Sequence, residues 1–159
     1  MELLNLLESS GLATHMRLST WSYPLFNAGH LLGVCLLIGS ILPMDLRLMG
    51  CWRSIPLLQL WRVLIPVAAS GLGLAVLCGF PLFIARASDY AASPLFWGKM
   101  ILLLSALFNI VIVRAILPRP GSSFWLSHET PPTGARICAT LSIVFWLGTL
   151  LAGRLIGYF

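Results

Sequence analysis

Long apolar stretches separated by short polar segments dominate the chain from residue 21 onwards. Four of these stretches have the length and sparse charge of membrane spans, and they cover residues 21–44, 63–85, 95–117 and 137–158. A helix needs about 20 mostly apolar residues to cross the hydrocarbon core of a bilayer, and a backbone in lipid must satisfy its own hydrogen bonds. We therefore predict an all-α transmembrane four-helix bundle. Its third and fourth spans contain Lys99, Arg114 and Arg154, which can reach the headgroups on their long side chains.

The segment before the first span has a different pattern. Leu3, Leu6 and Leu7 recur at helical spacing, and charged residues occupy several of the other positions. A short amphipathic helix lying in the membrane interface has this pattern. We therefore predict an interfacial segment over residues 1–20 and one four-helix transmembrane domain over residues 21–159.

The composition agrees with a membrane protein. Hydrophobic residues make up 58% of the 159 residues and charged residues only 9%, whereas soluble domains carry about 25% charged residues. The net charge of +5 comes from ten scattered basic residues and not from a cluster of the kind that binds nucleic acid. The sequence contains no P-loop, H-E-x-x-H or G-x-S-x-G motif. These features disfavour a soluble enzyme and favour an electron-transfer or structural membrane subunit.

The distribution of basic residues predicts the orientation. One side of the membrane would hold Arg47, Arg53, Arg62, Arg114, Arg119 and Arg136, and the other Arg17, Arg86, Lys99 and Arg154. Basic residues concentrate on the cytoplasmic side. We therefore expect the loops 49–62 and 118–136 inside, both termini outside, and a location in the bacterial inner membrane.

His30 is the one histidine within a predicted span. Asn27 lies one helical turn before it, and Gly29 and Gly33 form a G-x-x-x-G pattern that permits close helix approach. We expect the face that carries Asn27, His30 and Gly33 to point into the bundle. His30 could then ligate haem iron or another metal, or carry a proton. It could equally be a buried neutral histidine whose ring donates a hydrogen bond to a carbonyl or to Asn27.

Cations on the other spans would lie at the same end of the bundle as His30. His30 is about 13 Å inside the outer end of its helix, and Arg86, Lys99 and Arg154 fall near the outer ends of the other three. This arrangement suits a b-type haem, whose propionates would meet the cations while His30 binds the iron. It also suits a quinone held by hydrogen bonds. The alternative is that each cation simply reaches lipid phosphates.

A second ligand would complete such a metal site. Met100 could supply a thioether to haem, and His15 lies on the outer side in the entry segment. A haem shared between two copies of His30 in a homodimer is a further arrangement. Cys78 lies near His30 in depth, so that Cys78, His30 and Met100 would form a soft ligand set for Cu(I).

Asp45 is the only acidic residue of the predicted inner end of the first helix. Arg47, Arg62 and Arg114 are expected nearby. A structural ion pair between Asp45 and one of these arginines, holding the helices together, is a more natural interpretation than proton transfer.

Several stretches together resemble a family of small uncharacterised bacterial four-helix membrane proteins, a domain of unknown function. They are WSYPLFNAGHLLGVCLLIGSILPMDLRLMG, SDYAASPLFWGKM and AGRLIGYF, and the matching positions are His30, Asp45, Arg47, Lys99 and Arg154. A looser similarity extends to copper-resistance D-like proteins and small b-type cytochromes. That similarity implies haem, copper or electron transfer.

These observations favour one functional hypothesis over two others. The favoured function is a small redox subunit that holds a b-type haem or a quinone near the outer leaflet. The first alternative is a non-catalytic anchor or assembly subunit of a larger membrane complex, and the second is Cu(I) binding or transport. The expected partners are the lipid bilayer and other membrane subunits or a second copy, with no nucleic acid.

Overall fold

The computed structural model describes residues 2–118, 123–125 and 131–158, and in this part of the chain it is helical without strands. Four long helices form the body of the molecule: α3 (Ser22–Met49), α4 (Leu57–Ala85), α6 (Pro94–Ile116) and α7 (Thr133–Leu155). All four are long and apolar enough to cross a membrane. The predicted all-α four-helix fold is confirmed. Arg119, which contributed to the predicted orientation, lies outside the described residues.

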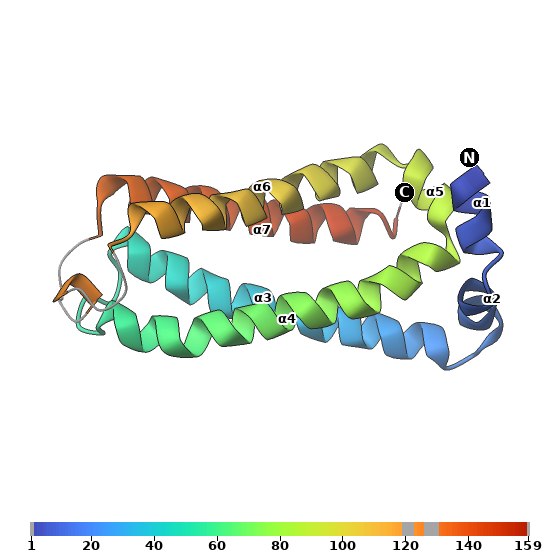
Figure 1. Cartoon of the computed structure of the whole chain (residues 1–159), viewed down its shortest axis with the longest axis horizontal. Coiled ribbons are helices and arrows are strands. Elements are labelled where there is room, and N and C mark those ends of the chain that lie inside the picture. Colours follow the sequence, from blue (N-terminus) through green and yellow to red (C-terminus); the bar gives the residue numbers. More distant parts are fainter. Residues whose placement is uncertain (1, 119–122, 126–130, 159) are drawn as a thin grey trace.

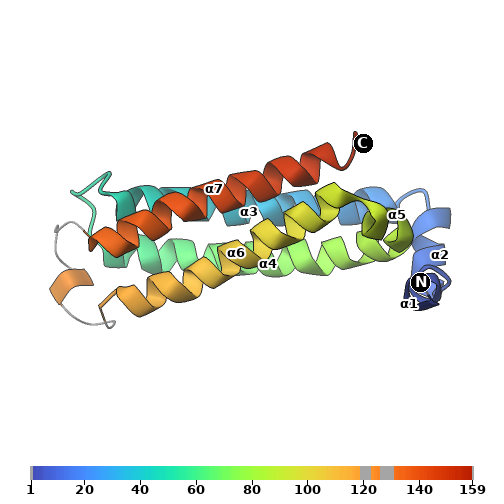
Figure 2. The same cartoon turned by 90° about the horizontal axis from the view of Figure 1, so that it is seen from above.

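The long helices form two antiparallel hairpins, α3–α4 and α6–α7, stacked in two layers (Figures 1 and 2). Helix α3 packs against both α4 and α7, whereas α4 and α6 do not pack closely on each other. Both termini lie at one end of the bundle, the terminal end (Figure 1). The α3–α4 connection, the C-terminal end of α6 and the N-terminal end of α7 lie at the other end, the loop end. The two hairpins therefore meet through α3 and α7 and stay apart between α4 and α6.

The first two long helices extend beyond the apolar stretches that predicted them. Helix α3 continues through Asp45 and Arg47 and ends at Gly50, whose φ of 106° is the left-handed conformation that glycine adopts readily at a helix end. Helix α4 begins at Leu57, well before the apolar run that starts after Arg62. Helical hydrogen bonding continues past the hydrophobic stretch because charged side chains are tolerated in the terminal turns.

Helices α3 and α4 cross with their backbones in contact. A Cβ atom added to Gly33 would lie 2.5 Å from the backbone nitrogen of Ala75, and one added to Gly71 would lie 2.6 Å from that of Leu37. A Cβ added to Gly29 would meet the Cys78 sulfur at 2.7 Å. The predicted role of the G-x-x-x-G pattern in close helix approach is confirmed, and the helix that packs against it is α4.

The N-terminal segment covers the terminal end as two short helices, α1 (Glu2–Glu8) and α2 (Gly11–Leu18), instead of one. The break occurs because Ser10 starts a new helix, its hydroxyl accepting a hydrogen bond from the Ala13 amide at 3.3 Å. Ala13 and Met16 of α2 are fully buried, and Met16 packs with residues of α4. The segment is therefore packed on the bundle as well as amphipathic.

An additional short helix, α5 (Ala87–Ala92), follows α4 and receives the N-terminal segment. The backbone amide of Ser88 donates a hydrogen bond of 2.7 Å to the Glu8 carboxylate, and the Ser88 hydroxyl donates a second. Arg17 donates to the carbonyl oxygens of Glu8, at 2.6 Å, and Ala85, at 3.3 Å. The two hydrogen bonds from Ser88 lower the pKa of Glu8 below its ordinary value of 4.5.

Candidate functional site

His30 lies on α3 at its crossing with α4, in the half of the bundle nearer the terminal end. Its Nδ1 atom is 2.7 Å from the carbonyl oxygen of Ala75. A carbonyl can only accept, so Nδ1 carries the proton and donates, and Nε2 keeps its lone pair. The ring lies against Gly79, where an added Cβ would be 2.9 Å from Nδ1. The expected hydrogen bond from His30 to a carbonyl is present, and it fixes both the orientation and the tautomer of the ring.

The other residues predicted to act with His30 differ in their exposure. Asn27 is exposed, so the expectation that it points into the bundle is wrong: it follows a different side of α3 from Gly33. His15 is exposed on α2, with its Nε2 atom 3.0 Å from the Ser22 hydroxyl. Met100 is half-buried on α6.

Cys78 and His30, two of the three ligands expected for copper, both lie at the α3–α4 crossing. Cys78 is half-buried and its sulfur faces Gly29 across the α3–α4 crossing. Within the described residues, no three His, Cys, Asp or Glu side chains lie close enough together to hold a metal ion.

The three predicted cations differ in how they are held. Lys99 is half-buried, within electrostatic range of His30, and its Nζ atom would lie 3.5 Å from a Cβ added to Gly153. Arg154 is exposed and donates from Nη2 to the Tyr158 hydroxyl at 2.9 Å. Arg86 is exposed at the junction of α4 and α5. Of these three cations, Lys99 is therefore the one whose charge interacts with His30.

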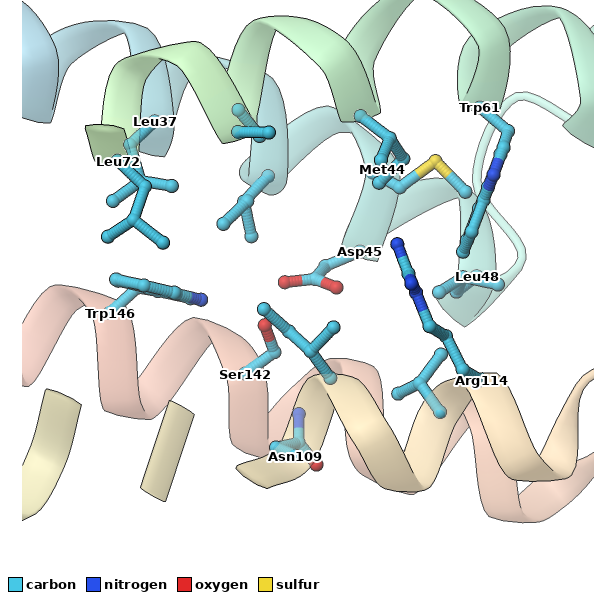
Figure 3. Close-up of a pocket in the computed structure, with 16 residues that line it drawn as sticks. Leu37, Met44, Asp45, Leu48, Trp61, Leu72, Asn109, Arg114, Ser142 and Trp146 are labelled. Carbon is cyan, nitrogen blue, oxygen red and sulfur yellow. The ribbon is translucent and has the colours of Figure 1, made fainter. Parts of the chain in front are cut away.

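A pocket of about 160 Å³ lies between all four long helices, nearer the loop end (Figure 3). Its walls are mostly aliphatic, from α3 (Leu37, Ile41, Met44, Leu48), α4 (Ile65, Ala68, Ala69, Leu72) and α6 (Ile110, Val113), with Trp61 at one side. Polar side chains also face it: Asp45 of α3, Asn109 and Arg114 of α6, and Ser142 and Trp146 of α7. It combines a hydrophobic lining with a few polar groups, as small-molecule sites do.

Two polar atoms of the pocket are buried without a partner. Asp45 is 6% exposed and its Oδ2 atom has no hydrogen bond, and Trp146 is 2% exposed and its Nε1 atom has none. Figure 3 shows the Asp45 carboxyl facing the Ser142 side chain and the Trp146 indole approaching from the same helix as Ser142. Buried polar groups in proteins are almost always hydrogen-bonded, so each exception calls for an explanation.

Asn109, a third polar residue of the pocket, has a hydrogen-bond partner on the neighbouring helix. Its Nδ2 atom donates to the carbonyl oxygen of Cys138 at 2.9 Å, in a buried position. The bond joins α6 to α7 beneath the pocket. Asn109 therefore has a structural role that Asp45 and Trp146 do not share.

Of the arginines expected around Asp45, one is buried and two are exposed. Arg47 is 1% exposed; its Nε atom donates to the carbonyl of Ile55 at 2.8 Å, whereas its Nη1 atom is buried without a hydrogen-bond partner. Arg62 and Arg114 are exposed. Figure 3 shows Arg114 reaching from α6 toward the side of the pocket where Asp45 lies. Oδ2 of Asp45 has no hydrogen-bond partner, so no arginine donates to it. The ion pair of Asp45 with an arginine therefore stays a prediction.

Two polar residues of the pocket, Trp146 and Ser142, carry no prediction from the sequence pattern. Trp146 lies in the middle of its span, whereas membrane tryptophans concentrate at the interfaces. That unusual depth was the available signal. No family model, curated protein or solved structure matches this chain.

Proposed function

We propose that this integral membrane protein is a small electron-transfer subunit that binds a b-type haem through His30. The hydrogen bond from Nδ1 of His30 to the Ala75 carbonyl, 2.7 Å long, supports this proposal. Histidines that ligate metals almost always donate their other ring nitrogen to a carbonyl, carboxylate or water, which orients the ring. Nε2 is then the ligating atom. Haem supplies one-electron transfer when bound.

Other residues would complete the site in defined ways. Lys99, half-buried and in electrostatic range of His30, would neutralise a propionate. Arg154 would contribute only after leaving Tyr158. Met100, next to Lys99 on α6, and His30 of a second copy are the candidates for the second axial position.

Titration of the purified protein with haem tests the proposal. The wild type should give a Soret band, and His30→Ala should abolish it or change it grossly. His15→Ala is the matched control, since it removes an exposed histidine outside the spans. Lys99→Gln should weaken haem binding about tenfold, by loss of a charge-assisted contact, and Arg154→Gln should weaken it less. A folded wild type without a haem spectrum would exclude haem.

A quinol, the reduced form of a quinone, would use the same free nitrogen, because Nε2 can accept a hydrogen bond from a quinol hydroxyl. The quinone form of the proposal predicts that a short-chain quinol shifts the ¹⁵N signal of Nε2 of His30 in the colourless protein. His15→Ala should leave this shift unchanged.

A non-catalytic anchor or assembly subunit is the second candidate, and one observation favours it. His30 already joins α3 to α4 through Ala75, at a crossing where glycine backbones touch. In this case the wild type should bind neither haem nor quinol at His30, and His30→Ala should lower the melting temperature. Cu(I) binding through Cys78, His30 and Met100 is the third hypothesis, and a Cu(I) titration of Cys78→Ser against the exposed-cysteine control Cys51→Ser tests it.

We further propose the bacterial inner membrane as the location, with the terminal end outside. The basic residues of the loops support this orientation. Cys51 is exposed in the α3–α4 connection, and Ser88 is exposed at the terminal end. In intact cells, an impermeant thiol reagent should label a single cysteine at Ser88 and not one at Cys51. Labelling at Cys51 and not at position 88 would show that the orientation is the opposite of the one proposed.

A further inference from the structure

The loop-end pocket holds two buried polar atoms that nothing in the described structure satisfies, Oδ2 of Asp45 and Nε1 of Trp146. In the carboxylate form of Asp45, Oδ2 is an acceptor, whereas the indole N–H of Trp146 is a donor. An unpartnered polar group in apolar surroundings costs free energy, and each would gain from a matching partner. A ligand that both accepts and donates would satisfy the two together.

The size and lining of the pocket restrict what that ligand can be. The cavity of about 160 Å³ is close to the engineered cavity of about 150 Å³ that binds benzene in another protein. Its walls are aliphatic, with indole rings from Trp61 and Trp146. A single aromatic ring fits this volume and this lining, whereas a larger cofactor does not.

We propose that the loop-end pocket binds a small neutral aromatic alcohol, a phenol- or quinol-type ring. The ring lies against the aliphatic walls. A ligand oxygen accepts a hydrogen bond from Nε1 of Trp146, and a ligand hydroxyl donates to Oδ2 of Asp45. Where the ligand is a phenol, its single hydroxyl both accepts and donates, and the Ser142 side chain faces the same space (Figure 3). This site is independent of His30 and of the proposed haem.

The ligand enters between α4 and α6. Among the residues that line the pocket, Ala69 of α4 and Arg114 of α6 are exposed. These two helices do not pack closely on each other, in contrast to α3 with α4. Since both are membrane spans, the opening lies where a lipophilic ring dissolved in the bilayer can reach it.

A pair of ligands of equal shape tests the proposal. 4-Methylphenol and p-xylene differ by one hydroxyl in place of a methyl group. Both are titrated calorimetrically into the full-length protein in lipid nanodiscs, with empty nanodiscs subtracted. 4-Methylphenol should bind at least tenfold more tightly than p-xylene, because only the phenol can satisfy the buried polar atoms.

Three variants and one control locate this preference. Trp146→Phe and Asp45→Leu should each reduce the phenol preference about tenfold and leave p-xylene affinity within a few-fold of wild type. Ala69→Phe should fill the opening and abolish binding of both ligands. Trp97→Phe removes an exposed tryptophan outside the pocket and should change nothing.

The proposal is overturned by any of three results. The wild type shows no preference for 4-methylphenol, or Trp146→Phe retains the whole preference, or Ala69→Phe binds as the wild type does. Because Ala69 is exposed, this variant decides the question even if the changes at Asp45 or Trp146 prevent folding.

Discussion

The two halves of α3 place an ionisable side chain in opposite environments. His30 lies where α3 and α4 touch, and its ring nitrogen donates to the Ala75 carbonyl. Asp45 lies where four helices surround a pocket, and Oδ2 of its carboxyl has no partner. The difference comes from helix separation. Glycines bring a backbone carbonyl of α4 within reach of His30, whereas larger side chains at the loop end leave a space.

This comparison shows why a polar residue in a span has no fixed meaning by itself. At a close crossing, a histidine on one helix can hydrogen-bond to the backbone of the other, and its second ring nitrogen stays free. A looser junction leaves a carboxyl facing a cavity, where a ligand can supply the missing hydrogen bond. The sequence suggests a cofactor at His30 and a structural role for Asp45, but the structure leaves Asp45 the less satisfied of the two.

The largest expected effect concerns the glycine crossing itself. Gly33→Leu should destabilise the protein by about 3 kcal/mol, because the added side chain meets the α4 backbone and forces the helices apart. Gly73→Leu is the matched control, since a Cβ there meets nothing within 4 Å. Thermal unfolding in one detergent measures both. Equal melting temperatures for the two variants would contradict the close crossing.

A smaller effect separates the satisfied from the unsatisfied polar residue at the loop end. Asn109→Ala should cost about 2 kcal/mol, because it removes the buried bond to Cys138 and leaves a small cavity. Asp45→Leu should raise stability by about 1 kcal/mol, because it removes a buried group with an unpaired oxygen. Chemical denaturation of both variants gives the comparison. A large loss of stability in Asp45→Leu would instead support the ion pair with Arg47, Arg62 or Arg114.

The smallest effect is the attachment of the N-terminal segment. Hydrogen bonds from Ser88 lower the pKa of Glu8, so the contact between α1 and α5 is fully stabilised above the ordinary value of 4.5 and is lost as the pH falls through the lower, folded value. The amide signal of Ser88 followed by NMR against pH should titrate with a midpoint below 4.5. Glu8→Gln should abolish this titration. A midpoint at or above 4.5 would show that Glu8 does not bind Ser88.

Much of the fold follows from the sequence, because membrane spans have a strong compositional signal. The four apolar runs predict the four long helices, and the G-x-x-x-G at Gly29 and Gly33 predicts a close crossing. The charges at Asp45 and Arg47 mislead the prediction of where α3 ends. Hydropathy locates the lipid boundary, whereas a helix ends where a residue such as Gly50 breaks its hydrogen bonding.

The candidate sites are less predictable, because they depend on which helices are neighbours. Helical spacing predicts that Asn27 and His30 lie near each other. It does not predict the angle at which α3 meets α4, and this angle leaves Asn27 exposed. Asp45 and Trp146 are roughly a hundred residues apart in the chain. They come together only because α3 contacts α7. The sequence shows polar residues within spans and cannot show which of them meet.

One NMR experiment tests the contrast between the two halves of α3 most directly. In protein in nanodiscs labelled with ¹⁵N at tryptophan and histidine, the imidazole of His30 should show a proton on Nδ1 and none on Nε2. Addition of 4-methylphenol should shift the Trp146 indole signal and leave the His30 signals in place. Movement of the His30 signals with an unchanged Trp146 signal would contradict the account, because it would place the ligand at the glycine crossing and leave the loop-end pocket empty.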